Sequence, residues 1–237
     1  MLLSYIDLLF QAPLEFLRIL PGLLLTTAVA LGAAISIHEC SHAVTALWLG
    51  DPTAQSRGRV SLNPRAHLDP AGTVMLLLVG FGWGKPTPVN TLNFRRPLQG
   101  MTLVSLAGPL SNLALALALA LPLRFGWLTL ASGFIAAPDL FSGDWSTILG
   151  SIVYYTFYIN VLLAVFNLLP VAPLDGFKIL LGVLPEQARR PFARLEPYGP
   201  VILMGVILLD WGFNTGILSR VIFPPIQFFV RLMLGYF

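Results

Sequence analysis

The sequence has little charge for its length. Asp, Glu, Lys and Arg make up 11% of the 237 residues, whereas a soluble domain carries about 25%. A water-soluble fold could not cover its surface with so few charged side chains. Intrinsic disorder is excluded as well, because disordered chains combine low hydrophobicity with high charge and this chain is 56% hydrophobic.

Cysteine is almost absent. Cys40 is the only one, and a single cysteine cannot form a disulfide within the chain. The N-terminal residues also lack the pattern of a secretory signal, which begins with a basic region. Asp7 and Glu15 interrupt the apolar stretch, and no basic residue precedes Arg18. We therefore expect this segment to remain in the mature protein.

What the sequence does contain is long apolar runs, reflected in a mean hydropathy of +0.79. About five or six runs approach the roughly 20 residues that a membrane-spanning helix needs, which predicts an all-α polytopic integral membrane protein. The expected segments are an interfacial or short helix over 1–21 that ends at Pro21-Gly22, spans over 23–49, 101–121 and 145–169, and further apolar segments over 201–213 and 217–236. We predict one domain over 1–237, with its core at about 22–176 and C-terminal helices over 200–236.

Shorter elements are expected between the spans. The apolar run 72–81 has about ten residues, too few to cross a membrane, so it predicts a re-entrant segment. Prolines and glycines exclude 82–90 from a helix, and this loop could pair with an extended substrate by strand addition. Residues 56–60 could start a small β-hairpin. A basic, proline-rich loop is expected over 185–200.

The basic residues predict the orientation. The loop over 51–99 holds six of the fourteen Lys and Arg residues, the loop over 176–199 holds four, and 122–144 holds only Arg124. By the positive-inside rule, the first two loops are cytoplasmic. The net charge of +3 is spread too thinly to favour nucleic acid as a partner. The expected partner is the lipid bilayer, and Arg95-Arg96 and Arg189-Arg190 are expected to meet anionic headgroups.

The first long span contains His38-Glu39-Cys40-Ser41-His42. Histidines at positions i and i+4 share one helical face, so both imidazoles can bind one Zn²⁺ while Glu39 lies beside the metal as a general base. The alternative is two unrelated core histidines beside an incidental glutamate. We disfavour it because an unpaired glutamate in lipid costs about 2.5–3.5 kcal/mol.

A catalytic zinc site needs a third protein ligand and an open position for water. Asp175 is the best candidate, because Pro170 and Pro173 break the helix before it and let its carboxylate turn inward. Asp175 could instead start a turn before Gly176. Asp210 is the rival ligand, but it lies at the far end of a short apolar segment, whereas Asp175 lies at the same predicted membrane side as His42.

Three further polar residues each allow a functional and a structural interpretation. Asn112 lies about 16 Å along its helix, nearly level with His38, so it could hold the substrate or bond a neighbouring helix. Asn167 could contact the substrate or cap the broken segment that follows it. His67 could approach the site from its loop, but its Asn-Pro and Asp-Pro neighbours favour a structural turn.

The order of these motifs resembles the site-2 protease family, zinc metalloproteases that cut within membranes. The residues that carry the resemblance are His38-Glu39-Cys40-Ser41-His42, Asn63-Pro64, His67, Asp69-Pro70, Gly72, Gly108-Pro109, Asn112, Asn167, Pro170 and Leu174-Asp175-Gly176. The resemblance implies His38, His42 and Asp175 as zinc ligands and Glu39 as the base. It covers residues 22–176 and is closest to the short, core-only branch without PDZ or CBS domains.

The resulting hypothesis is a zinc endopeptidase that hydrolyses peptide bonds within or next to the span of a transmembrane protein substrate. One catalytic Zn²⁺ is the expected cofactor. The expected location is a prokaryotic inner membrane, with the active site nearer the cytoplasmic side. The alternatives are a transporter or channel with an internal metal or proton site, and a catalytically silent scaffold of the same fold. The intact Glu39 argues against the scaffold.

Overall fold

The computed structural model describes residues 6–79, 82–129, 140, 144–213 and 215–235, and this part of the chain is helical without a β-strand. The α-helices are α1 (Ile6–Gln11), α2 (Pro13–Trp48), α3 (Thr53–Ser56), α4 (Pro70–Val79), α5 (Pro97–Arg124), α6 (Trp145–Asn167), α7 (Asp175–Val183), α8 (Glu186–Ala193), α9 (Gly199–Phe213) and α10 (Ile217–Leu234). Short 3₁₀ turns are η2 (Pro64–Ala66), η3 (Thr91–Asn93) and η4 (Glu196–Tyr198). The predicted all-α class is confirmed.

Five helical segments of the described residues are long and apolar enough to cross a membrane. They are α2, α5, α6, α10 and the run Glu186–Asp210, which covers α8 and most of α9. This confirms a polytopic membrane protein. By contrast, α4 has 10 residues and a length of about 15 Å, half of the hydrocarbon core. Its re-entrant placement stays a prediction, and residues 80–81 of that run lie outside the described residues.

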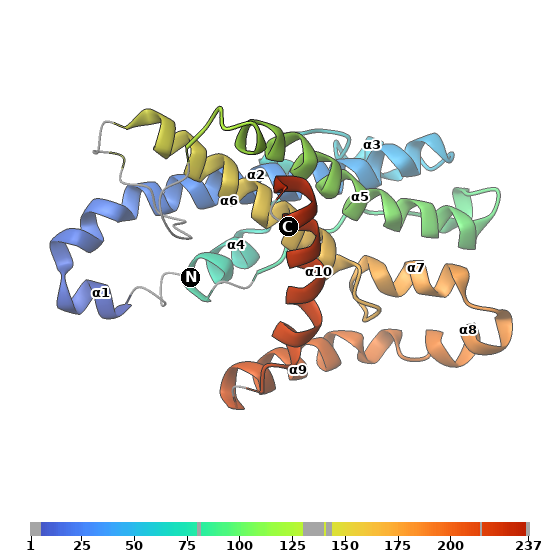
Figure 1. The fold of residues 1–237 in the computed structure, drawn as a ribbon. Coiled ribbons are helices and arrows are strands. Elements are labelled where there is room, and N and C mark those ends of the chain that lie inside the picture. Colours follow the sequence, from blue (N-terminus) through green and yellow to red (C-terminus); the bar gives the residue numbers. More distant parts are fainter. Residues whose placement is uncertain (1–5, 80–81, 130–139, 141–143, 214, 236–237) are drawn as a thin grey trace.

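Helices α2, α5 and α6 pack against one another and lie along the upper part of Figure 1. Small residues at their contacts allow close approach, which drives helix packing in lipid where the hydrophobic effect between helices is weak. The fully buried alanines are Ala30, Ala34, Ala43 and Ala46 in α2, Ala116 and Ala120 in α5, and Ala164 in α6. Helix α7 packs on α5, and α10 crosses α5 and α6.

The loops that carry most of the basic residues gather at one end of this bundle. In Figure 1, α3, the start of α5 and the connection between α7 and α8 lie at the right end, whereas α6 begins at the left end. The two loops predicted to be cytoplasmic therefore share one end, opposite the start of α6. That this end faces the cytoplasm stays a prediction.

The predicted break at Pro21-Gly22 is wrong. Helix α2 begins at Pro13 and continues through Pro21 for 36 residues. An interior proline removes one hydrogen bond and clashes with the preceding turn, but ending the helix would leave several backbone groups without partners. In lipid such groups cost several kcal/mol each, so a continuous helix is the better solution.

Two predicted irregular segments also differ from the structure. The hairpin expected at 56–60 does not form, since α3 ends at Ser56 and the chain turns at Gly58, whose φ is +66°. The loop expected over 185–200 instead contains α8 and η4. Pro185 precedes the first turn of α8, and Glu186 pairs with Arg190 at 2.6 Å; an i,i+4 ion pair of this kind supports a helix.

Asp51 ties the end of α2 to the chain before α5. Its fully buried carboxylate accepts hydrogen bonds from the Asn90 backbone N–H at 2.7 Å, the Asn93 side chain at 2.6 Å and the Thr53 backbone N–H at 3.1 Å. Burial raises the pKa of the Asp51 carboxyl, but the hydrogen bond from the Thr53 hydroxyl and the three above outweigh burial and hold the pKa below its ordinary value.

We expect Asp51→Asn to destabilise the protein. The amide nitrogen of the asparagine would face hydrogen-bond donors, whereas the carboxylate oxygen in its place now accepts their hydrogen bonds. Hydrogen bonds to a charged group contribute about 2 kcal/mol to stability. The loss of this contribution should lower the Tm in detergent by about 4–8 °C. Since the folded pKa is depressed, this stabilisation is present above the unfolded pKa of about 3.9 and is lost as the pH falls through the folded pKa. A Tm difference that stayed constant into that acidic range would contradict this account.

Candidate metal centre and active site

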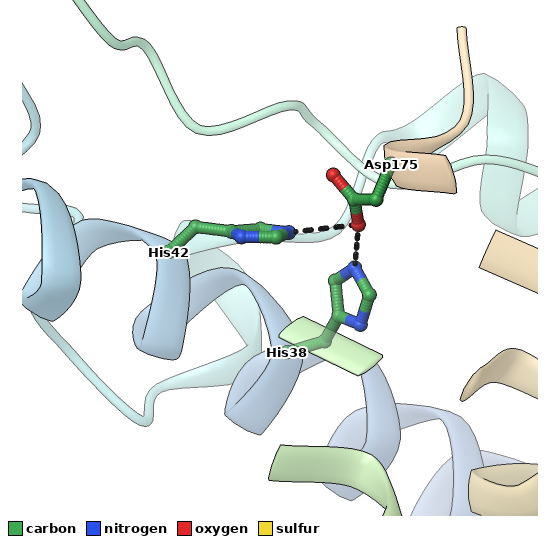
Figure 2. A group of neighbouring side chains, drawn as sticks. All are labelled: His38, His42 and Asp175. Atoms are coloured by element: carbon green, nitrogen blue, oxygen red, sulfur yellow. Dashed lines mark hydrogen bonds and ion pairs between the residues drawn. The ribbon is translucent and has the colours of Figure 1, made fainter. Parts of the chain in front are cut away.

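Three potential metal ligands converge between α2 and α7 (Figure 2). His38 and His42 project from one face of α2, one turn apart, and Asp175 is the first residue of α7. The Asp175 Oδ2 lies 3.1 Å from the His38 Nε2 and 3.2 Å from the His42 Nε2. All three residues are buried. The structure therefore brings together the residues that the sequence singles out as metal ligands.

Asp175 reaches this position because the chain turns sharply between α6 and α7. Gly176 packs against the end of α6, where a Cβ atom would lie 2.3 Å from the Leu168 carbonyl oxygen and 2.4 Å from that of Leu169. A glycine is therefore required for this close approach. The Asp-Gly pair both starts a helix and directs the carboxylate toward the two imidazoles. The interpretation of Asp175 as a metal ligand is therefore compatible with its interpretation as the start of a turn.

The Nδ1 atoms of both imidazoles face hydrogen-bond acceptors. His42 Nδ1 lies 2.6 Å from the Val104 carbonyl oxygen, and His38 Nδ1 lies 2.6 Å from Asn112 Oδ1. The Asn112 amide is oriented because its nitrogen donates to Ala34 O at 2.9 Å and to Asn160 Oδ1 at 2.8 Å. Both imidazoles therefore donate their Nδ1–H to these oxygens.

The Nδ1–H tautomer leaves a lone pair on each Nε2, and both lone pairs point at a carboxylate. Such a group of acceptors is complementary to a cation, and two imidazoles with one carboxylate make a common catalytic zinc site. The acceptors behind the imidazoles are also typical, since metal-binding histidines donate their other N–H to a carbonyl or carboxylate. The donor set thus fits a zinc ion.

Gly108 of α5 leaves the room that this group occupies. A Cβ atom at this position would lie 2.5 Å from the Nε2 and Cε1 atoms of His42 and 2.7 Å from the Cε1 of His38. Any larger residue would displace both imidazoles. The close approach of the α5 backbone is therefore part of the site.

Glu39 lies beside this group on α2 and is half-buried. Its Oε2 accepts a hydrogen bond from the Thr87 backbone N–H at 2.8 Å, and the Thr87 hydroxyl donates to the Glu39 carbonyl oxygen at 3.1 Å. The 82–90 loop thus fixes the carboxylate of Glu39, the residue that follows His38 in the sequence. This placement suits a general base that acts on a water at the metal.

The remaining candidates lie elsewhere or have other partners. Asn112 uses its oxygen and both amide hydrogens within the protein, so it contacts His38 and offers no open donor to a substrate. Asn167 donates to Leu163 O at 2.9 Å in its own helix, and its substrate role stays a prediction. Asp210 accepts from Ile217 N at 2.7 Å, away from the metal-binding group.

His67 lies in the turn that follows η2 and is fully buried. Its Nε2 donates to the Ser61 carbonyl oxygen at 2.6 Å, and it is not part of the metal-binding group. This supports the structural reading of His67. Sequence reasoning missed Asn160, although it carries the same signal as Asn112: a polar side chain in the middle of an apolar span.

Comparisons with known proteins support this chemistry. The model of peptidase family M50 matches residues 26–209. The chain belongs to this family, the site-2 proteases. A Bacillus subtilis protein named "Putative zinc metalloprotease YwhC" is 37% identical over 200 residues, which cover 83% of this chain and 84% of that protein. No solved structure matches the chain.

More distant relatives carry the same description. The Mycobacterium tuberculosis protein "Putative zinc metalloprotease Rip2" is 30% identical over 190 residues, covering 77% of this chain and 68% of that protein. The protein of the same name from Mycolicibacterium smegmatis is 30% identical over 185 residues, which cover 76% of this chain and 65% of that protein. The predicted enzyme class and cofactor are confirmed: this M50 peptidase is a zinc metalloprotease.

Asn112→Leu is expected to weaken zinc binding about 10- to 100-fold, the usual effect of removing a partner of a metal-binding histidine. The leucine fills a similar volume but cannot accept the His38 Nδ1–H, so that imidazole is no longer held in one tautomer. Chelator competition on the purified protein measures the affinity. Asn160→Leu, which removes only the partner of Asn112, should have a smaller effect. Equal affinities for the wild type and Asn112→Leu would contradict this role.

Proposed function

We propose that this metalloprotease is an intramembrane endopeptidase that acts as one membrane-embedded domain. In this proposal His38, His42 and Asp175 hold the zinc ion, and Glu39 is the general base. The observation that carries the proposal is the burial of this group between α2 and α7, with α2 long and apolar enough to cross a membrane. A buried acid and two histidines at such a place are expensive unless they have a function.

The chemistry follows from the positions of the side chains. His38, His42 and Asp175 would hold the zinc ion, which would supply Lewis-acid activation of the scissile carbonyl and of a water molecule. Glu39 takes the proton of that water and later delivers it to the leaving amine. His38 and His42 keep their orientation through Asn112 and the Val104 carbonyl.

The substrate class follows from the location of the group. A transmembrane helix hides its carbonyls in i→i−4 hydrogen bonds, so the substrate has to unwind before cleavage. Two irregular segments lie next to the site: the turn over 168–174 leads directly to Asp175, and the 82–90 loop contacts Glu39. We propose that they receive the extended segment, with Asn167 at the first of them. The proposed location is a prokaryotic inner membrane, with the site nearer the cytoplasmic side.

Cleavage-site mapping tests this function. The purified protein, reconstituted in vesicles with zinc, is incubated with a single-span reporter, and the products are identified by mass spectrometry. We expect a cut within or next to the span, and no cut after zinc is removed with a chelator. A matched reporter whose span is a strong, uninterrupted helix should be cut more slowly, because unwinding is harder.

The result that contradicts the proposal is equally specific. Cleavage of an unfolded soluble polypeptide, together with no cleavage of any single-span reporter, would leave a zinc protease without intramembrane activity. Cleavage that persists without zinc would contradict the assigned ligands.

A further inference from the structure

The peptide group between Pro86 and Thr87 lies between a buried cation and Glu39. Its carbonyl oxygen accepts a hydrogen bond from Arg59 Nη2 at 2.9 Å, and its N–H donates to Glu39 Oε2 at 2.8 Å. One peptide unit therefore connects the guanidinium of the 51–69 loop to the carboxylate on α2. Arg59 and Glu39 interact through this unit rather than by direct contact.

Arg59 is unusual for an arginine because it is only 4% exposed. Its guanidinium also donates to the carbonyl oxygens of Ala66 and Lys85. Among the described residues no carboxylate pairs with it directly. Burial lowers the pKa of Arg59, and the nearby charge of Glu39 opposes this shift. A buried cation is costly unless its hydrogen bonds and charge are compensated, so this position indicates a specific role.

The local sequence makes Thr87 the single backbone donor of this segment. Pro86 and Pro88 have no N–H, so only Thr87 can donate from Pro86-Thr87-Pro88. The Thr87 hydroxyl adds a second contact, to the Glu39 carbonyl oxygen at 3.1 Å. The loop is thus attached to Glu39 at two atoms, and Arg59 holds the loop from the other side.

We propose that Arg59 and Thr87 are positioning residues for the general base. The inference rests on the proposed function and adds residues outside the zinc ligands. Donation from Arg59 polarises the Pro86–Thr87 peptide and strengthens its N–H as a donor, since hydrogen bonds in a chain reinforce one another. The N–H then holds Glu39 Oε2 in one direction and leaves Oε1 to take the proton of the attacking water.

Arg59→Met and Arg59→Lys test this role, with Arg57→Met as the matched control, because Arg57 is an exposed arginine of the same loop. Zinc content, kcat and KM are measured with the single-span reporter. We expect Arg59→Met to keep its zinc and KM while kcat falls about 10- to 100-fold, the effect of a small misplacement of a catalytic group. Arg59→Lys should recover part of kcat because it keeps a cation, and Arg57→Met should match the wild type.

Thr87→Pro removes the N–H itself and should lower kcat as Arg59→Met does. If both act through one peptide unit, the double variant loses no more than either single variant, because residues of one network are not additive. Thr87→Pro and Arg59→Lys also carry the test if Arg59→Met does not fold.

Three outcomes would overturn the inference: a zinc-loaded Arg59→Met with wild-type or higher kcat, a loss confined to KM, or fully additive losses in the double variant. A wild-type protein that cleaves no single-span reporter overturns the proposed function instead, so the two failures are distinguishable.

Discussion

Glu39→Gln is expected to keep its zinc and to lose cleavage by about 10²- to 10⁴-fold, the usual contribution of a general base. Glutamine has the shape of glutamate, and its amide oxygen can still accept the Thr87 N–H that now bonds Oε2. It cannot take a proton from water. The metal-binding group of His38, His42 and Asp175 is untouched by the change.

The measurement is kcat with the single-span reporter, alongside zinc content for the same preparation. Glu196→Gln is the matched control, since Glu196 is an exposed glutamate in η4, outside the metal-binding group. It should match the wild type in both readouts. A zinc-loaded Glu39→Gln that cleaves as fast as the wild type would show that another group is the base.

Gly108→Ala should weaken zinc binding strongly although it changes no ligand. The added methyl group would lie 2.5 Å from the His42 ring and 2.7 Å from the His38 ring, well inside van der Waals contact. Overpacking of this kind costs about 1–3 kcal/mol, or about 5- to 140-fold in zinc affinity at 1.4 kcal/mol per tenfold. Activity at limiting zinc should fall by the same factor.

Chelator competition compares Gly108→Ala with Gly205→Ala. Gly205 lies in α9, and a Cβ atom there would have no neighbour within 4 Å, so this variant controls for the general effect of alanine in a helix. It should bind zinc as the wild type does. If Gly108→Ala kept wild-type zinc affinity, the imidazoles would have to hold the metal in positions other than those of the structure.

The convergence of His38, His42 and Asp175 could be predicted in part because some of the signals are local. The spacing of His38 and His42 places both on one helical face, and Glu39 is marked by its cost in an apolar span. For Asp175 the sequence allows both a metal ligand and the start of a turn. Its approach to the histidines depends on the turn after α6, where Gly176 packs against two carbonyl groups.

The partners of these residues could not be predicted, because each joins distant parts of the chain. His38 and Asn112 are 74 positions apart, and Asn112 and Asn160 are 48 apart. The sequence indicates the depth of Asn112 in its helix but not which neighbour it faces, so its contact with His38 was missed. The sequence marks Arg59 only as one of several loop charges, since nothing in its local sequence indicates burial.

The predicted element boundaries are wrong where a stronger constraint overrides a local sequence rule. Pro21 was expected to end a helix, yet α2 continues through it, because the apolar environment favours an unbroken backbone ladder. The prolines over 185–200 were expected to prevent helix formation, yet Pro185 lies just before α8, where its fixed φ is tolerated.

Zinc K-edge X-ray absorption on the purified wild-type protein tests the central claim most directly, because it reports the atoms bound to the metal. We predict nitrogen and oxygen neighbours at about 2.0–2.2 Å, with the outer-shell scattering of two imidazole rings. A sulfur neighbour at about 2.3 Å would point to Cys40, and a zinc ion without imidazole scattering would exclude His38 and His42. Either result would contradict the proposed site.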